Sequence, residues 1–441
     1  MYITRIIDKK LAAWAKNPKR LPLILRGARQ VGKTAAIMAL GRTAGFFDNV
    51  VKIDFEEDPG LAKVFAASLN AELLIRNLEA ATGQPIKAGK TLLFFDEVQE
   101  CPRAISSLRY FREQVPDLHV VAAGSLLEFA LGDISMPVGR VEFTYMRPMS
   151  FGDFLHATGR GLLDERRPNI MRWNEAMSPT VIEGESLDNA LREYAIVGGM
   201  PEALSTYVTG KSLIETANVH DRLLRSFRDD IPKYAQGDLQ RANLAKSLLA
   251  LAAATGHQIT YTKLIDDDAK RTKLSVHLLE QAMIVSIARA SSGAGLPLGA
   301  SASSKCLKPV YLDVGLMQRA CGRSASQVLD SKNLVADFKG QIAEQFVGQE
   351  LLVQASGSES EQLYFWQRAE RGSSAEVDFL LSRDGQIVPF EVKSGPSGRL
   401  RSLHLFLAEH LQVPNAYCLQ QRMTLEQIEK IRFAPLWSRL A

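Results

Sequence analysis

One segment has the residue types and spacing of a phosphate-binding loop, GxxxxGK(S/T): Gly27, Ala28, Arg29, Gln30, Val31, Gly32, Lys33 and Thr34. Glycines let the backbone curl so that successive N–H groups converge on phosphate oxygens. The following helix N-terminus adds a positive dipole end. Lys33 is expected to reach the β- and γ-phosphates of ATP, and the Thr34 hydroxyl to ligate Mg²⁺. A glycine-rich turn before a structural helix is the alternative, which the flanking apolar strand and helix disfavour.

A second group of chemistry-bearing residues ends the apolar run LLFFDE, residues 92–97. A buried strand that ends in two carboxylates places them at the carboxyl edge of a parallel sheet, where ligands bind in α/β folds. Asp96 is expected to hold the Mg²⁺ shell, and Glu97 to orient and deprotonate the attacking water. A surface Asp-Glu pair is the alternative. Transfer to another acceptor is less favoured, because a carboxylate after the metal aspartate suits hydrolysis.

A third group lies near the C-terminus, in EVDF (residues 376–379) and EVK (residues 391–393). Asp384-Gly385 predicts a turn between them, so Asp378 and Glu391 would stand on paired strands. Period two puts Glu391 and Lys393 on one strand face. Two carboxylates and a lysine suit Mg²⁺- or Mn²⁺-assisted phosphodiester hydrolysis, with Asp378 and Glu391 as metal ligands and Lys393 positioning water. From spacing alone, a salt-bridged hairpin remains the alternative.

The nucleotide residues need a sheet to hold them, and the N-terminal part supplies short apolar runs between helical segments. Continuous apolar strands that alternate with helices predict a parallel sheet covered on both faces, hence an α/β fold. An amphipathic helix is expected in the first 20 residues. The predicted strands are Leu21–Leu25, Val50–Phe55, Thr91–Glu97, His119–Ser125 and Val141–Met146.

The rest of the chain is expected to be helical first and mixed afterwards. Residues 151–234 look mainly helical, with a loop at 159–184, and three further helices precede a hairpin, which resembles a winged helix. Residues 324–332 look like a linker. The expected later elements are helices Leu239–Ala254, Thr262–Ile265, Lys273–Ile287, Gly340–Gln354 and Leu400–His410, and strands Lys308–Leu316, Gln362–Gln367, Ala375–Ser382, Gln386–Lys393 and Ala416–Leu419. The predicted domains are an ATPase core at 1–157, a helical lid at 158–236, a winged helix at 237–323 and a C-terminal domain at 333–441.

Five segments together resemble a branch of the AAA+ ATPases of bacteria and archaea: LRGARQVGKT, FFDEVQECP, AAGSLLEFALG, VGRVEFTYMRPMSFGDFL and YAIVGGMPEAL. The resemblance implies a P-loop core, a helical lid, a winged helix and a mixed α/β domain similar to PD-(D/E)XK nucleases, the restriction-endonuclease-like fold. It also implies that Ser125 contacts the γ-phosphate or water, and that Arg140 serves the γ-phosphate, in cis or from a neighbouring subunit. Glu344 matches the extra acidic residue of the nuclease-like fold. Met136-Pro137-Val138 depart from the small residue and longer polar loop usual before the Gly-Arg pair.

Charge and composition restrict the partners. The 53 Lys and Arg residues against 49 Asp and Glu residues give a net charge of +4, so only a local patch would indicate nucleic acid. Lys263, Lys270, Arg271 and Lys273 form such a patch in the expected winged helix, although three aspartates at 266–268 interrupt it. The four cysteines form no CxxC pair, which fits a reducing cytoplasm. The sequence contains no run of about 18 apolar residues, so no membrane span is expected.

Two functions follow from these expectations. The first is an ATP-hydrolysing protein that acts on DNA, with a C-terminal domain that binds or cleaves DNA using a divalent metal. The second is a nucleotide-dependent switch whose C-terminal domain only binds a partner. A protein-remodelling ATPase is a weaker third, because the sequence shows no clear aromatic pore loop. A homo-oligomer is expected if Arg140 acts in trans.

Overall fold

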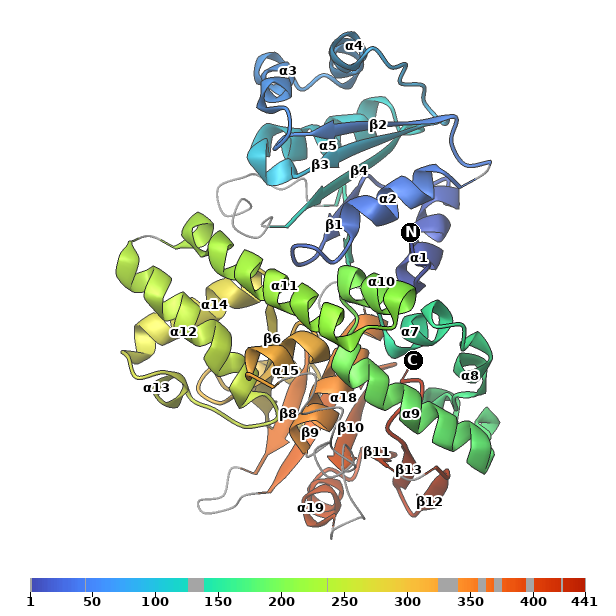
Figure 1. The fold of residues 1–441 in the computed structure, drawn as a ribbon, viewed down its shortest axis with the longest axis vertical. Helices are drawn as coiled ribbons and strands as arrows, with labels where there is room; N and C mark the ends of the chain where they lie inside the picture. Colours follow the sequence, from blue (N-terminus) through green and yellow to red (C-terminus); the bar gives the residue numbers. More distant parts are fainter. Residues whose placement is uncertain are drawn as a thin grey trace. The chain divides into compact units, whose positions relative to one another are not determined.

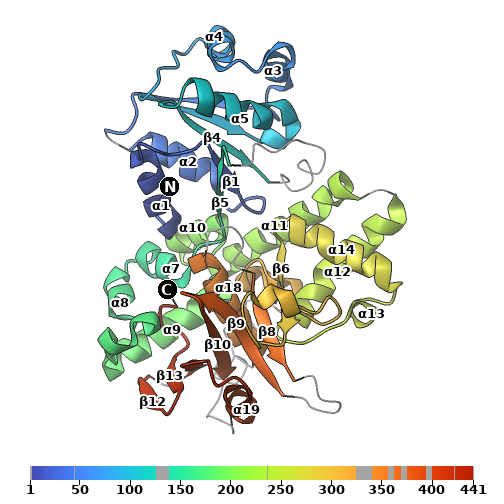
Figure 2. The ribbon, with the colours of Figure 1, turned by 180° about the vertical axis from the view of Figure 1, so that it is seen from behind.

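The computed structural model describes residues 2–43, 45–125, 139–235, 237–323, 340–355, 362–368, 375–393, 400–421 and 423–440 (Figures 1 and 2). It contains two compact units: unit 1 is built from Met1–Arg147, and unit 2 from Pro148–Ala355 and Ser360–Ala441. The predicted linker at 324–332 lies outside the described residues. No helix among the described residues is both long enough and apolar enough to cross a membrane.

Unit 1 is built on a parallel five-stranded sheet in the order β2-β3-β4-β1-β5. Its strands are β1 Leu23–Arg26, β2 Asn49–Asp54, β3 Thr91–Asp96, β4 His119–Gly124 and β5 Glu142–Tyr145. These bounds lie within two residues of the predicted ones, which confirms the parallel sheet. In the register Asp54 lies beside Asp96 and Arg26 beside Gly124, so the carboxyl ends of four strands form one edge.

Helices cover both faces of this sheet. Leu93 and Phe95 pack into a core with residues of the helices that follow β2 and β3. Leu92 faces the other way, toward Gly41 of the first helix after β1. The helices of unit 1 are α1 Ile6–Lys16, α2 Lys33–Gly41, α3 Ala62–Ala67, α4 Ala71–Thr82 and α5 Pro102–Gln114, with single turns η1 Pro59–Leu61 and η2 Val98–Glu100. The two buried faces explain why the strands read as continuous apolar runs.

Unit 2 begins with helices. The loop expected at 159–184 instead contains a helix, a 3₁₀ segment and the start of a 17-residue helix, whose N-cap Thr180 forms a capping box with Glu183. The helices are α7 Phe151–Ala157, α8 Gly161–Arg166, η4 Ile170–Glu175, α9 Val181–Val197, α10 Pro201–Gly210, α11 Leu213–Tyr234, α12 Asp238–Ala254, α13 Tyr261–Leu264, α14 Ala269–Gln281, η5 Leu298–Ser301 and α15 Val314–Ala320. The expected helix at 273–287 was wrong at its end, since a strand begins at Val285.

An eight-stranded mixed sheet completes unit 2, in the order β12-β13-β11-β10-β9-β8-β6-β7. Its strands are β6 Val285–Ser291, β7 Leu307–Tyr311, β8 Tyr364–Gln367, β9 Glu376–Arg383, β10 Gln386–Lys393, β11 Ala416–Gln420, β12 Glu426–Ile428 and β13 Ile431–Pro435. Gly348 of α18 (Gly340–Ala355) packs on one face, near Phe379, and α19 (Arg401–Glu409) packs on the other, near Leu380. The hairpin β6–β7, expected in a separate winged helix, joins this sheet because β6 pairs in parallel with β8. The antiparallel pair β9–β10 turns at Asp384-Gly385, as predicted.

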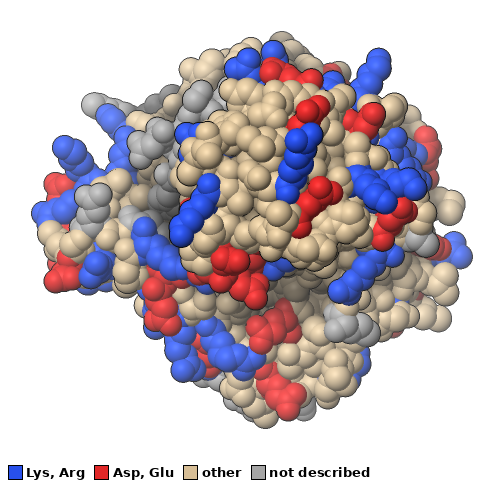
Figure 3. Space-filling view, turned by 90° about the horizontal axis from the view of Figure 1, so that it is seen from above, with Lys and Arg blue, Asp and Glu red and all other residues tan. Residues whose placement is uncertain are grey.

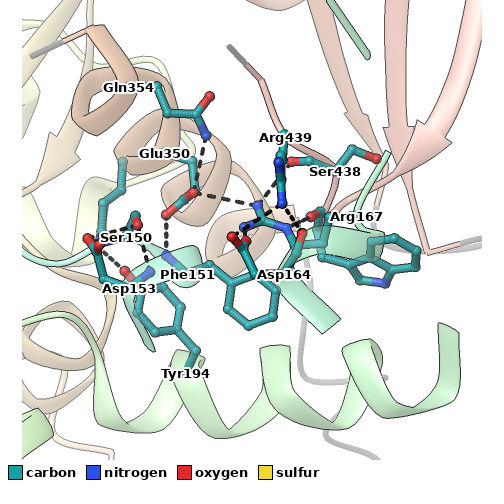
Figure 4. A network of polar contacts seen from close by, with 12 residues as sticks. Ser150, Phe151, Asp153, Asp164, Arg167, Tyr194, Glu350, Gln354, Ser438 and Arg439 are labelled. Atoms are coloured by element: carbon teal, nitrogen blue, oxygen red, sulfur yellow. Dashed lines mark hydrogen bonds and ion pairs between the residues drawn. The ribbon is translucent and has the colours of Figure 1, made fainter. Parts of the chain in front are cut away.

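A buried polar network ties the first helices of unit 2 to α18 (Figure 4). Glu350 accepts the Phe151 backbone N–H at 2.8 Å, and its second oxygen lies 3.9 Å from the Arg167 guanidinium. Arg167 also pairs with Asp164 at 2.8 Å. Burial raises the pKa of Glu350 to about 7, although Arg167 and the Phe151 N–H lower it in part.

The raised pKa predicts a pH-dependent stability. Because the folded state holds the Glu350 proton more tightly than the unfolded state, the free energy of unfolding should fall as the pH rises from about 4.5 to above 7. In Glu350→Gln, the loss of unfolding free energy over this pH range should be smaller by up to ~3 kcal/mol. Urea unfolding of both proteins at pH 5, 6, 7 and 8 measures the free energy of unfolding at each pH. The exposed Glu175→Gln is the control, and an identical pH slope in wild type and Glu350→Gln would refute the assignment.

Candidate nucleotide site and a buried carboxylate cluster

The loop between β1 and α2 has the backbone shape that the phosphate-binding pattern requires. Gln30 and Gly32 adopt positive φ angles of 63° and 94°, so the chain curls before α2 begins at Lys33. A Cβ on Gly27 would stand 2.5 Å from the Met146 carbonyl oxygen, which excludes a larger residue there. Ala28 and Val31 are buried and anchor the loop.

Lys33 is buried at the base of this loop. Its ammonium donates to the carbonyl oxygens of Gly27 at 2.9 Å and Ala28 at 3.0 Å. Burial lowers the pKa of Lys33 to about 8, and the carboxylates of Glu97 and Asp96 oppose that shift. A phosphate would supply the negative charge that holds this ammonium protonated.

The predicted metal ligands meet at the carboxyl edge of the sheet. The Thr34 hydroxyl donates to Asp96 Oδ2 at 2.8 Å, so α2 and β3 bring the two side chains into direct contact. Burial raises the pKa of Asp96. Lys52, from β2, lies 2.7 Å from Asp54 and 3.5 Å from Asp96. Thr34 and Asp96 are the side chains that could hold one Mg²⁺ here, with the Lys52 ammonium beside them.

Glu97 and Ser125 also come together at this edge. Glu97 follows β3 in a left-handed conformation, φ 46°, which turns its side chain away from the strand direction. Its Oε2 accepts from Gln99 Nε2 at 2.8 Å and from the Ser125 hydroxyl at 3.4 Å. A carboxylate held between two donors is positioned to orient a water molecule.

Arg140 is not brought to this edge of its own subunit. It precedes β5, and the start of β5 lies beside the start of β1, since Glu142 pairs with Leu23. In a parallel sheet that is the amino edge, opposite the loop that follows Arg26. The half-exposed Arg140 contacts Glu113 at 3.2 Å, close to the end of α5. Of the two roles expected for Arg140, in cis or from a neighbouring subunit, this position favours the second.

The C-terminal candidates are gathered around a residue that sequence reasoning missed. Lys308 of β7 is fully buried, and its ammonium lies 3.0 Å from Glu344 Oε2, 3.1 Å from Asp378 Oδ1 and in contact with Glu376. Burial lowers its pKa, but Asp378, Glu344 and Glu376 outweigh burial and raise it overall. Burial, followed by Asp378, raises the pKa of Glu344 and of Glu391 to about 8.

The residues expected to bind a divalent metal are paired with lysines in the structure. Lys308 stands between the carboxylates, and the remaining oxygen of Asp378 accepts the Val392 N–H at 2.8 Å. Lys393 pairs with Glu391 instead of standing free to position water. Among the described residues, no group of three or more His, Cys, Asp or Glu side chains is arranged to hold a metal ion. Lys393 and Glu391 pair along one strand, β10, and so do not bridge the two strands of the hairpin.

Three residues that sequence reasoning missed, Lys52, Asp54 and Lys308, left different signals in the sequence. Lys52 and Asp54 alternate along VVKIDF and end a strand at the edge that holds the nucleotide loop, so their position was readable. Lys308 stands in a strand-like run, but nothing local to it indicates carboxylates that come 36 and 70 residues later.

Comparison with protein families assigns the parts of the chain separately. Residues 19–155 match the AAA domain family. Residues 188–327 match a domain of unknown function (DUF8612), and residues 339–438 match another (DUF4143). No curated protein sequence matches the chain.

Several solved structures are distantly similar. A signal transduction ATPase with a tetratricopeptide repeat sensor from Pyrococcus horikoshii is 11% identical over 80% of this chain and 48% of its own, with a TM-score of 0.27. The Thermotoga maritima RuvB Holliday junction branch migration motor is 15% identical over 64% of this chain and 89% of its own, with a TM-score of 0.29. AMPPCP-bound DnaA from Aquifex aeolicus is 12% identical over 63% of this chain and 87% of its own, with a TM-score of 0.26. This chain thus spans about half the length of the first of these proteins. The segment 19–155 thus matches the AAA domain family and carries a phosphate-binding loop of the P-loop type.

Proposed function

We propose that this protein binds ATP with Mg²⁺ and hydrolyses it in unit 1. The observation that carries the proposal is the convergence of Lys33, Thr34 with Asp96, and Glu97 with Ser125 at one edge of the AAA sheet. When bound, Mg²⁺ would neutralise phosphate charge beside Thr34 and Asp96. The chain itself supplies the phosphate cradle, the ammonium of Lys33 and a general base. Release of inorganic phosphate from ATP, with Mg²⁺ and with EDTA, tests it.

Arg140 has a proposed role between subunits. An arginine at the amino edge of the sheet, half exposed and held by Glu113, stands apart from its own phosphate loop but is accessible to a neighbouring copy. We expect a homo-oligomer in which Arg140 of one subunit approaches the γ-phosphate bound by the next.

The proposed partner is nucleic acid, bound through α13 and α14. Lys263, Lys270 and Lys273 are exposed there. Two of the three neighbouring aspartates are engaged within the fold: Asp268 caps α14 by accepting from the N–H groups of Lys270 and Arg271, and Asp267 pairs with Arg271 at 3.5 Å. The lysines therefore carry much of the local charge. On the face seen in Figure 3, by contrast, basic and acidic side chains are interspersed, as a net charge of +4 leads one to expect.

DNA is predicted to stimulate ATP hydrolysis and to do so through these lysines. The double variant Lys270→Ala, Lys273→Ala should bind DNA more weakly. The slope of log affinity against log salt should also become shallower by about one per lysine, because each phosphate contact that is lost no longer releases a counterion on binding. Fluorescence anisotropy with single- and double-stranded DNA at several salt concentrations measures the affinity and its salt slope. The rate of ATP hydrolysis with and without DNA measures the stimulation. Arg401→Ala, an exposed cation on α19, is the matched control. An unchanged salt slope would exclude this surface as the DNA-binding site. If neither DNA binds, the alternative function stands, a nucleotide-dependent switch with another partner.

Of the two roles predicted for the C-terminal region, the contacts of Lys308 favour non-catalytic partner binding over DNA cleavage. That preference is independent of ATP hydrolysis in unit 1.

A further inference from the structure

Lys308 is enclosed on every side that the described residues define. Three carboxylates, Glu344, Glu376 and Asp378, contact its ammonium, and they come from α18 and β9. The rings of Phe365 and Phe379 lie 5.6 Å and 5.8 Å from the same nitrogen, within cation–π range. The side chain is 2% exposed. A lysine buried to this extent is stable only when it is paired, and here it is paired three times.

The strand that carries Lys308 is fixed to the helix that carries Glu344. Gln345 of α18 accepts the Tyr311 N–H and donates to the Tyr311 carbonyl, both at 2.8 Å. Gln349, one turn further along α18, accepts the Val314 N–H at 2.9 Å. On its other side β7 pairs with β6 along its whole length. These bonds fix the backbone of β7 beside α18, and the three carboxylates then hold the ammonium.

A divalent metal would need the oxygens that Lys308 already occupies. Mg²⁺ and similar ions bind carboxylate oxygens at about 2.0–2.6 Å. An ion that bridged Asp378 Oδ1 and Glu344 Oε2 would compete for the place of the ammonium, which lies 3.1 Å and 3.0 Å from these oxygens, and the two positive charges would repel. Glu391 Oε2 is buried and accepts no hydrogen bond in the described part of the chain, but a single oxygen does not hold a divalent ion.

We infer that Lys308 is the built-in cation of the acidic cluster formed by α18 and β9: it takes the position of the divalent metal expected there, so the C-terminal region binds no catalytic metal and does not cleave DNA. The cluster instead joins β7 to α18 and β9. The inference has a corollary. Removing the lysine side chain leaves the charges of Glu344, Glu376 and Asp378 uncompensated around a gap, and oxygen ligands of this kind bind Mn²⁺ or Mg²⁺ once they close around the ion.

The corollary is tested by calorimetric titration of nucleotide-free protein with Mn²⁺. The wild type and Asp378→Asn should give the same weak signal, with no binding that depends on Asp378. Lys308→Ala should bind one further Mn²⁺, at least about 10-fold tighter than the wild type, and Lys308→Ala with Asp378→Asn should lose it. Lys393→Ala is the matched control, because Lys393 pairs with Glu391 and not with the three carboxylates around Lys308. This variant should bind no further Mn²⁺.

Three results would overturn the inference. One is Mn²⁺ binding by the wild type that Asp378→Asn abolishes. Another is nicking of supercoiled plasmid by the wild type, with Mg²⁺ or Mn²⁺, that Asp378→Asn abolishes. The third is a folded Lys308→Ala protein without added Mn²⁺ affinity. If Lys308→Ala fails to fold, the comparison of wild type with Asp378→Asn decides alone. ATP hydrolysis, measured on the same wild-type sample, reports separately on the function proposed for unit 1.

Discussion

Replacing Glu97 with Gln is expected to leave ATP bound while slowing its hydrolysis by about 10²–10⁴-fold, the usual contribution of a general base. The amide keeps the size of the carboxylate and can still contact Gln99 and Ser125, but it cannot accept a proton from water. Lys33, Thr34 and Asp96, which are proposed to hold the nucleotide and its metal, are unchanged. Phosphate release and equilibrium binding of a fluorescent ATP analogue together separate the two effects.

The control lies three residues away. Glu100 is exposed at the end of η2, so Glu100→Gln changes the same charge on the same segment without touching Ser125. It should hydrolyse ATP at the wild-type rate. Wild-type turnover by Glu97→Gln would remove Glu97 from the catalytic role, and loss of nucleotide binding in that variant would show that it supports the loop instead.

The nucleotide site was largely predictable because its parts are local in sequence. The phosphate loop is eight consecutive residues, and the two carboxylates end one apolar strand. In a parallel sheet the ends of neighbouring strands meet at one edge, so the strands alone brought Asp96, Ser125 and the loop together. The contact of Thr34 with Asp96 spans 62 residues, yet it follows from that rule.

The C-terminal cluster was not predictable in the same way. The hairpin that carries Asp378 and Glu391 was found from its turn, whereas the lysine between the carboxylates comes from an edge strand that periodicity assigned to a separate winged helix. Which strand joins which sheet is decided by packing over long sequence distances, and here α18 makes that choice through Gln345 and Gln349. The local sequence therefore predicted the hairpin and its acidic residues, but not the lysine that pairs with them.

Arg140→Ala is expected to lower ATP turnover by about 10³-fold or more, as loss of an arginine that contacts the γ-phosphate from a neighbouring subunit does. The register places Arg140 at the amino edge, so its own loop should not depend on it. Mixing subunits tests the direction of the contact. Lys33→Ala subunits cannot hydrolyse ATP but carry Arg140, and Arg140→Ala subunits carry an intact loop.

Neither variant alone should turn over ATP, whereas a random 1:1 mixture should recover activity at roughly a quarter of its subunit contacts. An arginine that acted in cis would give no recovery, because no subunit in the mixture contains both groups. Arg109→Ala is the matched control: Arg109 contacts the same Glu113 oxygen, at 3.0 Å compared with 3.2 Å for Arg140, so it reproduces any structural effect of freeing that carboxylate. If Arg109→Ala were equally inactive, Glu113 and the end of α5 would explain the loss. If the protein sedimented as a monomer wherever it hydrolyses ATP, the contact between subunits would be excluded, and Arg140 would have no place in the reaction from either side.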